Sequence, residues 1–66
     1  MLCQIKQIGK CLYMQVNTGG TLEKLPRLKW WVEALLLLEN GFKGHLKVSK
    51  VRAFANNPEY QTRRKL

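Results

Sequence analysis

The sequence has few of the side chains that catalysis and metal binding require. Its four acidic residues are all glutamates, and it has one histidine and two cysteines. The glutamates are dispersed, so no two are placed as a general acid and base. His45, Cys3 and Cys11 fall short of the set of about four ligands that a zinc site needs. No glycine-rich phosphate-binding motif occurs. We therefore expect no enzyme activity, no metal or cofactor and no small-molecule substrate.

The sequence also lacks a segment that would enter a membrane. Its longest apolar stretch runs from Trp30 to Leu38, is interrupted by Glu33, and has about half of the roughly 20 residues that a spanning helix needs. No apolar leader follows Met1. Two cysteines are too few for the disulfide framework of a small secreted domain. These absences predict a cytoplasmic protein that does not bind membranes.

Positive charge is what the sequence has in excess. Twelve Lys and Arg against four acidic residues give 66 residues a formal net charge of +8. Such an excess is typical of proteins that bind polyanions, because it otherwise only adds self-repulsion to the fold. A hydrophobic content of 45% predicts one globular domain rather than a disordered basic tail. A domain of this size is marginally stable alone, so we expect a homodimer that enlarges the core.

The first sixteen residues predict a β-hairpin with a two-residue turn at Gly9-Lys10. Glycine suits the backbone conformation that such a turn requires. Side chains alternate along each strand, so one face of the hairpin is apolar and the other polar. The apolar face collects Cys3, Ile5, Leu12, Met14 and Val16. Cys3 and Cys11 then point to opposite faces, which argues against an intramolecular disulfide.

The central segment predicts an α-helix from Pro26 to Glu39, with Asn40-Gly41 as its stop. Apolar residues at helical spacing form the predicted core stripe: Leu28, Trp31, Val32, Leu35, Leu38 and Phe42. Three apolar residues outside this stripe, Trp30, Leu36 and Leu37, are candidate protein-interface residues. They form either an exposed dimer surface or a surface covered by the sheet and the C-terminal segment.

The segment from Phe42 to Ser49 alternates like a third strand. Beyond it the alternation slips, and two interpretations remain open. Either a bulge at Ser49-Lys50 continues the strand, or Ser49 caps a short helix. The expected fold is α+β: a ββαβ domain over residues 1–55, with a three-stranded antiparallel sheet packed on one helix, and a basic tail over residues 56–66.

The basic residues concentrate in the C-terminal third of the chain. Seven of the twelve follow Gly41, against one glutamate. The predicted nucleic-acid-binding residues are Lys43, His45, Lys47, Lys50, Arg52, Arg63, Arg64 and Lys65. Lysine and arginine contacts to phosphates release counterions and so supply binding energy. Few aromatic side chains lie beside them, so duplex DNA is preferred to single strands, with RNA as a second nucleic-acid partner.

The sequence therefore predicts a dimeric DNA-binding regulator that contacts phosphates through its C-terminal third. The alternative is an inhibitor or adaptor of the phage or plasmid type, which blocks an acidic site on a host protein. Its hot spots would be Trp30 and Leu37. An anionic membrane is disfavoured because the helix has only Arg27 and Lys29 as cations. A basic face that merely keeps the protein in solution is the remaining interpretation.

Overall fold

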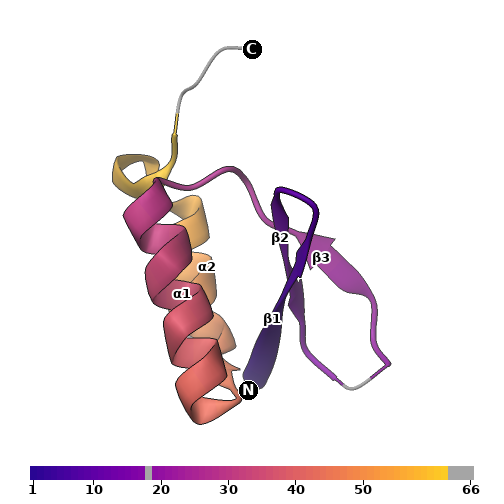
Figure 1. The fold of residues 1–66 in the computed structure, drawn as a ribbon. Helices are drawn as coiled ribbons and strands as arrows, with labels where there is room; N and C mark the ends of the chain where they lie inside the picture. Colours follow the sequence, from indigo (N-terminus) through magenta and orange to yellow (C-terminus); the bar gives the residue numbers. More distant parts are fainter. Residues whose placement is uncertain (18, 63–66) are drawn as a thin grey trace.

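The chain forms a small α+β domain with a four-stranded antiparallel sheet and two helices (Figure 1). This computed structural model describes residues 1–17 and 19–62. The strands are β1 (Leu2–Ile8), β2 (Cys11–Gln15), β3 (Leu22–Lys24) and β4 (Leu46–Lys47), in the order β3-β2-β1-β4. The helices are α1 (Trp30–Lys43), α2 (Val48–Asn56) and the short 3-10 helix η1 (Pro58–Tyr60). The predicted α+β class is confirmed, but the predicted ββαβ order with a three-stranded sheet and one helix is wrong.

The hairpin of β1 and β2 has the predicted register. Its pairs run from Ile8 with Cys11 to Gln4 with Gln15, and Gly9 has a φ of 62° in the turn. The predicted apolar face is confirmed, because its members are buried or packed against the core: Cys3, Ile5, Leu12, Met14 and Val16. Both cysteines are free, as expected.

Strand β3 was not expected from the sequence. It pairs with β2, so that Lys24 lies opposite Tyr13 and Leu22 opposite Gln15. All three of its residues are exposed. A strand without a buried face has no alternation of apolar and polar residues to reveal it, and its pairing with β2 depends on the loop that precedes it.

Helix α1 begins and ends later than predicted. It starts at Trp30, four positions after Pro26, and continues through Gly41 to Lys43, where Gly44 adopts a φ of 80° and closes it. The residues before it are extended because the C-terminal segment pairs with them. Leu28 bridges Gln61, and the Lys29 N–H donates to the Tyr60 carbonyl at 2.8 Å. This long-range pairing cannot be read from local helix signals.

The face of α1 that packs against the domain is not the predicted stripe. Val32 and Leu36 are fully buried, whereas Leu38 and Phe42 are exposed. Leu28 is buried but precedes the helix. Apolar residues occupy two sides of this helix, so periodicity alone does not choose between them.

Asn40 is the polar residue that lies on the packed side of α1. Its Oδ1 accepts from the Ile5 N–H at 3.1 Å, and its Nδ2 donates to the Ile5 carbonyl at 3.2 Å. Strand β4 pairs only with Leu2 and Cys3, so β1 has no strand partner at Ile5 on that side. The side-chain amide of Asn40 therefore makes the two hydrogen bonds to the Ile5 backbone that a neighbouring strand would otherwise make.

The open choice after Ser49 is decided in favour of a helix. Val48, Val51 and Ala55 of α2 are buried, and β4 covers only Leu46–Lys47 rather than the whole predicted strand. The residue that precedes the first turn of α2 is Lys47, not Ser49. A helix buries these three side chains together at spacings of three and four, whereas a strand would place Val48 on the opposite face from Val51 and Ala55.

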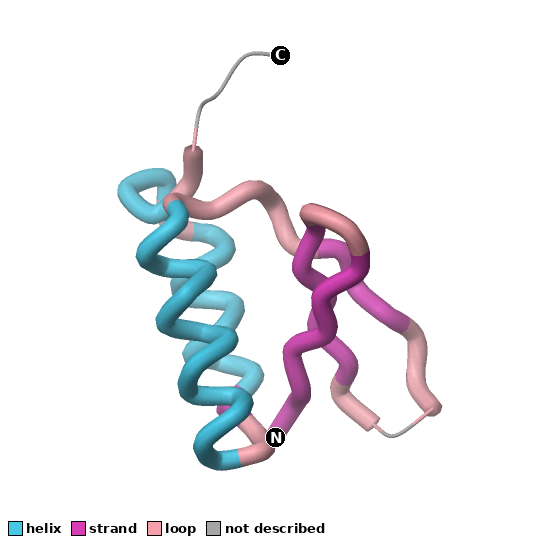
Figure 2. The backbone as a smooth tube through the Cα atoms, in the orientation of Figure 1, coloured by secondary structure: helices cyan, strands magenta, loops and turns pink. Residues whose placement is uncertain are grey.

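The first part of the predicted tail packs against the domain. Tyr60 lies edge-to-face with Trp31 and Phe54, at ring-centre distances of 5.7 and 4.9 Å. Gln61 Nε2 donates to the Ala55 carbonyl at 2.6 Å. Figure 2 shows this segment beside the loop that leads into α1. Contacts with the domain therefore continue to Thr62, whose N–H donates to the Arg27 carbonyl at 3.1 Å, while residues 63–66 lie outside the described part of the chain.

Replacing Asn40 by alanine is expected to lower the free energy of unfolding by about 1–3 kcal/mol, because it leaves both backbone groups of Ile5 without their partner. Urea unfolding measures this loss. Asn56→Ala is the matched control: it makes the same change in α2 at an exposed residue, and we expect a change within about 0.5 kcal/mol. Equal losses in the two variants would contradict the role given to Asn40.

Candidate functional site

Three of the predicted nucleic-acid-binding residues form ion pairs with glutamates. Lys50 Nζ lies 2.5 Å from Glu39 Oε2, and Lys43 Nζ lies 3.8 Å from Glu39 Oε1. Arg52 pairs with Glu23 of β3 at 3.7 Å. The structure thus gathers Lys43 and Lys50 around one carboxylate and directs Arg52 elsewhere. The predicted cluster is divided, and part of its charge is neutralised.

The remaining predicted residues are distributed differently. His45 and Lys47 are exposed, and among the described residues neither forms an ion pair. Arg63, Arg64 and Lys65 lie outside the described residues. Lys47 is therefore the one described lysine of the predicted set that has no carboxylate partner within the described chain.

Glu39 joins the two helices electrostatically. A hydrogen bond from Lys50 is the largest cause that lowers the pKa of Glu39, and the charges of Lys50 and Lys43 act in the same direction. Partial burial of the carboxylate opposes them. Because Glu39 lies in α1 and Lys50 lies in α2, their ion pair links the two helices, whereas Lys43 pairs with Glu39 within α1.

The outer face of the sheet carries three lysines without a carboxylate partner among the described residues: Lys6, Lys24 and Lys47. Cys3, Ile5, Met14 and Leu46 point into the core, so the residues that alternate with them point outward. Tyr13 lies opposite both Lys6 and Lys24 in the strand register. We call Lys6, Tyr13, Lys24 and Lys47 the open sheet face, because both helices lie on the other side of the sheet (Figure 1).

Sequence reasoning identified only part of the open sheet face. The hairpin register places Lys6 and Tyr13 on the polar face. Lys24 joins them only because β3 pairs with β2, and no local pattern indicates that strand. The alternation of β1 and β2 locates these two residues, and Lys47 is already among the predicted nucleic-acid-binding residues, so Lys24 is the member that sequence reasoning missed.

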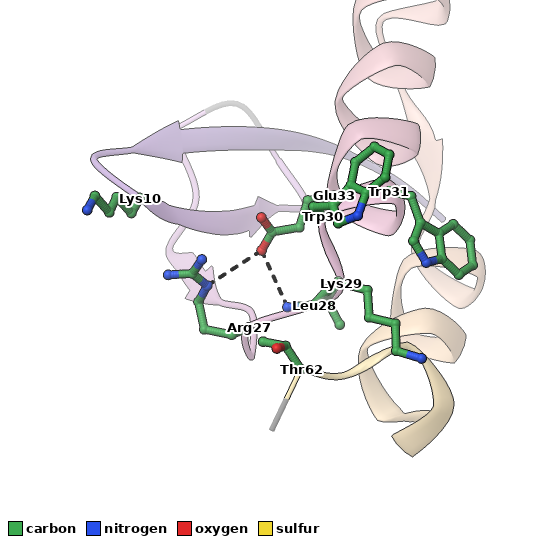
Figure 3. Close-up of a pocket in the computed structure, with 8 residues that line it drawn as sticks. All are labelled: Lys10, Arg27, Leu28, Lys29, Trp30, Trp31, Glu33 and Thr62. Atoms are coloured by element: carbon green, nitrogen blue, oxygen red, sulfur yellow. Dashed lines mark hydrogen bonds and ion pairs between the residues drawn. The ribbon is translucent and has the colours of Figure 1, made fainter. Parts of the chain in front are cut away.

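A shallow cleft lies beside the first turn of α1 (Figure 3). Its volume is about 590 Å³, and it is lined by Lys10, Arg27, Leu28, Lys29, Trp30, Trp31, Glu33 and Thr62. Glu33 Oε2 lies 3.8 Å from Arg27 Nε and accepts from the Leu28 N–H at 3.4 Å. Lys10 extends from the hairpin turn away from these groups, and the two tryptophan rings point to different sides (Figure 3). The Glu33 carboxylate at the base of the cleft is therefore already paired with Arg27. The other side chains that line the cleft do not point toward one common position where a ligand would bind.

The described residues present few groups for chemistry. Within residues 1–17 and 19–62, no three His, Cys, Asp or Glu side chains are grouped as a metal site would require. Burial raises the pKa of the Cys3 thiol, which makes it a poorer nucleophile. In the same part of the chain, neither α1 nor α2 has the length and apolar composition needed to cross a bilayer.

Exposed apolar side chains gather on the side of α1 that does not pack against the domain. Trp30, Leu38 and Phe42 are 80%, 71% and 87% exposed, and Trp31 and Leu35 are 43% and 39% exposed. We call these five residues the α1 outer face. Of the predicted interface residues, Trp30 belongs to it, Leu36 is fully buried, and Leu37 is half-buried against the core. Leu36 is therefore a core residue and offers no surface to a partner.

No family model, curated protein or solved structure is significantly similar to this chain. Its function must therefore be inferred from the geometry of its own surfaces. The two that carry the most information are the open sheet face, which is cationic, and the α1 outer face, which is apolar.

The stabilising contribution of Glu39 is expected to depend on pH. Its folded-state pKa is lowered, so the contribution is present above the usual carboxyl range and is lost as the pH falls through the lowered value. Lys50→Gln should therefore have a lower melting temperature than the wild type at neutral pH, and the difference should shrink in acid. Thermal unfolding followed by circular dichroism at both pH values measures this difference.

Lys29→Gln, at an exposed lysine without a described partner, should show no such pH-dependent difference. A difference for Lys50→Gln that is unchanged in acid would contradict this account.

Proposed function

We propose that this protein is a small DNA-binding regulator, not an enzyme, and that it binds duplex DNA through the open sheet face. The observation that supports this proposal is the placement of Lys6, Lys24 and Lys47. All three are exposed on the side of the sheet that no helix covers, and none has a carboxylate partner among the described residues. The formal net charge of +8 adds a long-range attraction to polyanions.

These lysines are suited to phosphate contacts for a physical reason. A lysine that is already paired must release its carboxylate before it can bind a phosphate, and that exchange reduces the gain. The lysines of the open sheet face have no described pair to break. Neighbouring strands lie roughly 4.8 Å apart, so the backbones at Lys6 and Lys24 are separated by about 10 Å across the sheet. Several phosphates of one duplex can therefore be contacted at once.

A duplex fits the open sheet face better than a single strand does. Binding of single strands uses aromatic rings on which successive bases stack. Tyr13 is the only aromatic residue on the described strands, and it is half-buried. Trp30 and Trp31 belong to α1, on the other side of the sheet. The face therefore offers charge for a backbone rather than a platform for bases.

The proposed site differs from the cluster expected from the sequence. Lys47 belongs to both, but Lys43, Lys50 and Arg52 are paired with Glu39 and Glu23. Their charges contribute to the attraction of DNA at a distance, while direct phosphate contacts fall to the open sheet face. Arg63, Arg64 and Lys65 add three further positive charges to the chain.

The triple variant Lys6→Gln, Lys24→Gln, Lys47→Gln should bind a labelled duplex much more weakly than the wild type. The plot of log binding constant against log salt concentration should become shallower by about 2.7, because each phosphate contact contributes about 0.9. Fluorescence anisotropy at several salt concentrations measures both effects. A labelled single strand of the same length tests the preference for a duplex.

The matched control removes the same number of charges elsewhere: Lys43→Gln, Lys50→Gln, Arg52→Gln. It should retain more affinity and a steeper salt dependence than the first variant, with circular dichroism verifying that both are folded. An equal loss of affinity in the two variants would show that binding depends on the net charge of the protein and not on the position of the lysines. Absence of duplex binding by the wild type at low salt would reject the proposed function.

An inhibitor or adaptor that binds an acidic host protein is the second candidate function. The exposed α1 outer face favours it, because a large exposed apolar patch commonly marks a protein-binding surface, and the net positive charge of the chain would attract an acidic partner. Trp30 is the predicted hot spot that remains exposed.

Capture from a nuclease-treated lysate separates the two functions. A host protein bound at the α1 outer face should be retained by the triple lysine variant of the open sheet face and lost from Leu38→Glu. If the host protein is instead lost from the triple lysine variant and retained by Leu38→Glu, it binds through the lysines of the open sheet face. That result would argue against the second function.

A further inference from the structure

We propose that a second copy of this chain covers the α1 outer face, with the two α1 helices packed antiparallel. The proposal is independent of DNA binding, because it concerns the protein alone and a different side of the molecule. It rests on three properties of the face: the order of its side chains, its area and its lack of charge.

The order of side chains along the face is symmetric. Trp31, Leu35, Leu38 and Phe42 follow one another at spacings of four, three and four residues. This alternation is that of a coiled-coil seam, which meets its partner along the whole helix. Read in either direction, the order is aromatic, leucine, leucine, aromatic. An antiparallel copy therefore places each aromatic ring opposite an aromatic ring and each leucine opposite a leucine.

A two-fold axis between Leu35 and Leu38 gives this arrangement. Trp31 of one copy then lies opposite Phe42 of the second copy, and Leu35 lies opposite Leu38. The same patch is used by both copies, as a two-fold interface requires. Trp31 is already held by its edge-to-face contact with Tyr60, so one aromatic anchor is positioned before the copies meet.

The area of the face suits a stable dimer. From their exposed fractions, its five side chains present roughly 650 Å² to solvent. Complete covering of both faces would bury at most about 1,300 Å², which reaches the range of specific protein–protein interfaces. A patch of this size on a monomer would be at the upper end of what such proteins expose.

Charge favours the antiparallel orientation. The charged residues of α1, Glu33, Glu39 and Lys43, lie outside the face. In an antiparallel pair each helix N-terminus lies beside the C-terminus of the second copy, so the helix dipoles attract, and the two Lys43 side chains lie roughly 20 Å apart along the axis; a parallel pair places like helix ends side by side.

Sedimentation equilibrium of the purified protein, without nucleic acid, tests the dimer. The wild type should have twice the 7.7 kDa mass of the chain at micromolar concentration. Leu38→Glu should raise the dimer dissociation constant by about 30-fold or more, because it places a carboxylate at the centre of the interface. Ala53→Glu is the control: it adds the same charge at an exposed residue of α2 and should leave the dimer unchanged.

Cysteine cross-linking tests the orientation. In a background with Cys11→Ser, a mixture of Trp31→Cys and Phe42→Cys chains should form the mixed disulfide, because these residues lie opposite each other. Neither variant alone should cross-link efficiently, since its two thiols are about 16 Å apart along the axis. Mass spectrometry distinguishes the mixed product from each symmetric one.

Three results would overturn the proposal. A monomeric wild type would leave the face to another occupant, such as the host protein of the second candidate function. A Leu38→Glu protein that is folded and still dimeric would move the interface elsewhere. Efficient symmetric cross-linking through Phe42→Cys would show a parallel pair. Loss of DNA binding by the lysine variant has no bearing on these outcomes, so the two proposals fail separately.

Discussion

The pairing of the Asn40 amide with the backbone of Ile5 determines how the helix faces the sheet. It satisfies both polar groups of a strand edge that β4 is too short to reach. With Asn40 held against β1, Val32 and Leu36 turn into the core. Leu38 and Phe42 lie roughly 160–200° around the helix from Asn40 and are turned away from the sheet. The polar contact and the burial of Val32 and Leu36 thus lie on the same side of the helix, and the side with more apolar residues is left exposed.

The few glutamates determine which cations remain available. Glu39 engages Lys43 and Lys50 where the two helices meet, and Glu23 engages Arg52. These pairs serve the packing of the domain, and three of the five described lysines without a carboxylate partner, Lys6, Lys24 and Lys47, lie on the uncovered side of the sheet. The two proposed surfaces therefore lie on opposite sides of the molecule. A dimer through α1 would present two open sheet faces that point away from each other, an arrangement suited to bridging two duplexes.

Much of the fold is predictable where the pattern is local. The hairpin register, its apolar face and the free cysteines follow from the alternation of side chains around Gly9. The limits of α1 do not, because Leu28 and Lys29 are held extended by Gln61 and Tyr60, more than thirty residues away. The candidate site was predictable only in part: Lys47 was identified, whereas Lys24 depends on a strand with no buried face.

The sequence by itself determined the charge of the molecule, the hairpin and the presence of one helix with more apolar surface than a small domain can cover. These properties depend on composition and on neighbours within a few positions. Only the tertiary structure decided which side of that helix is buried, which cations are neutralised, and where the remaining lysines gather. Those outcomes depend on contacts between residues that are distant in the sequence, such as Asn40 with Ile5 and Lys50 with Glu39. Local periodicity does not specify which residues form such contacts.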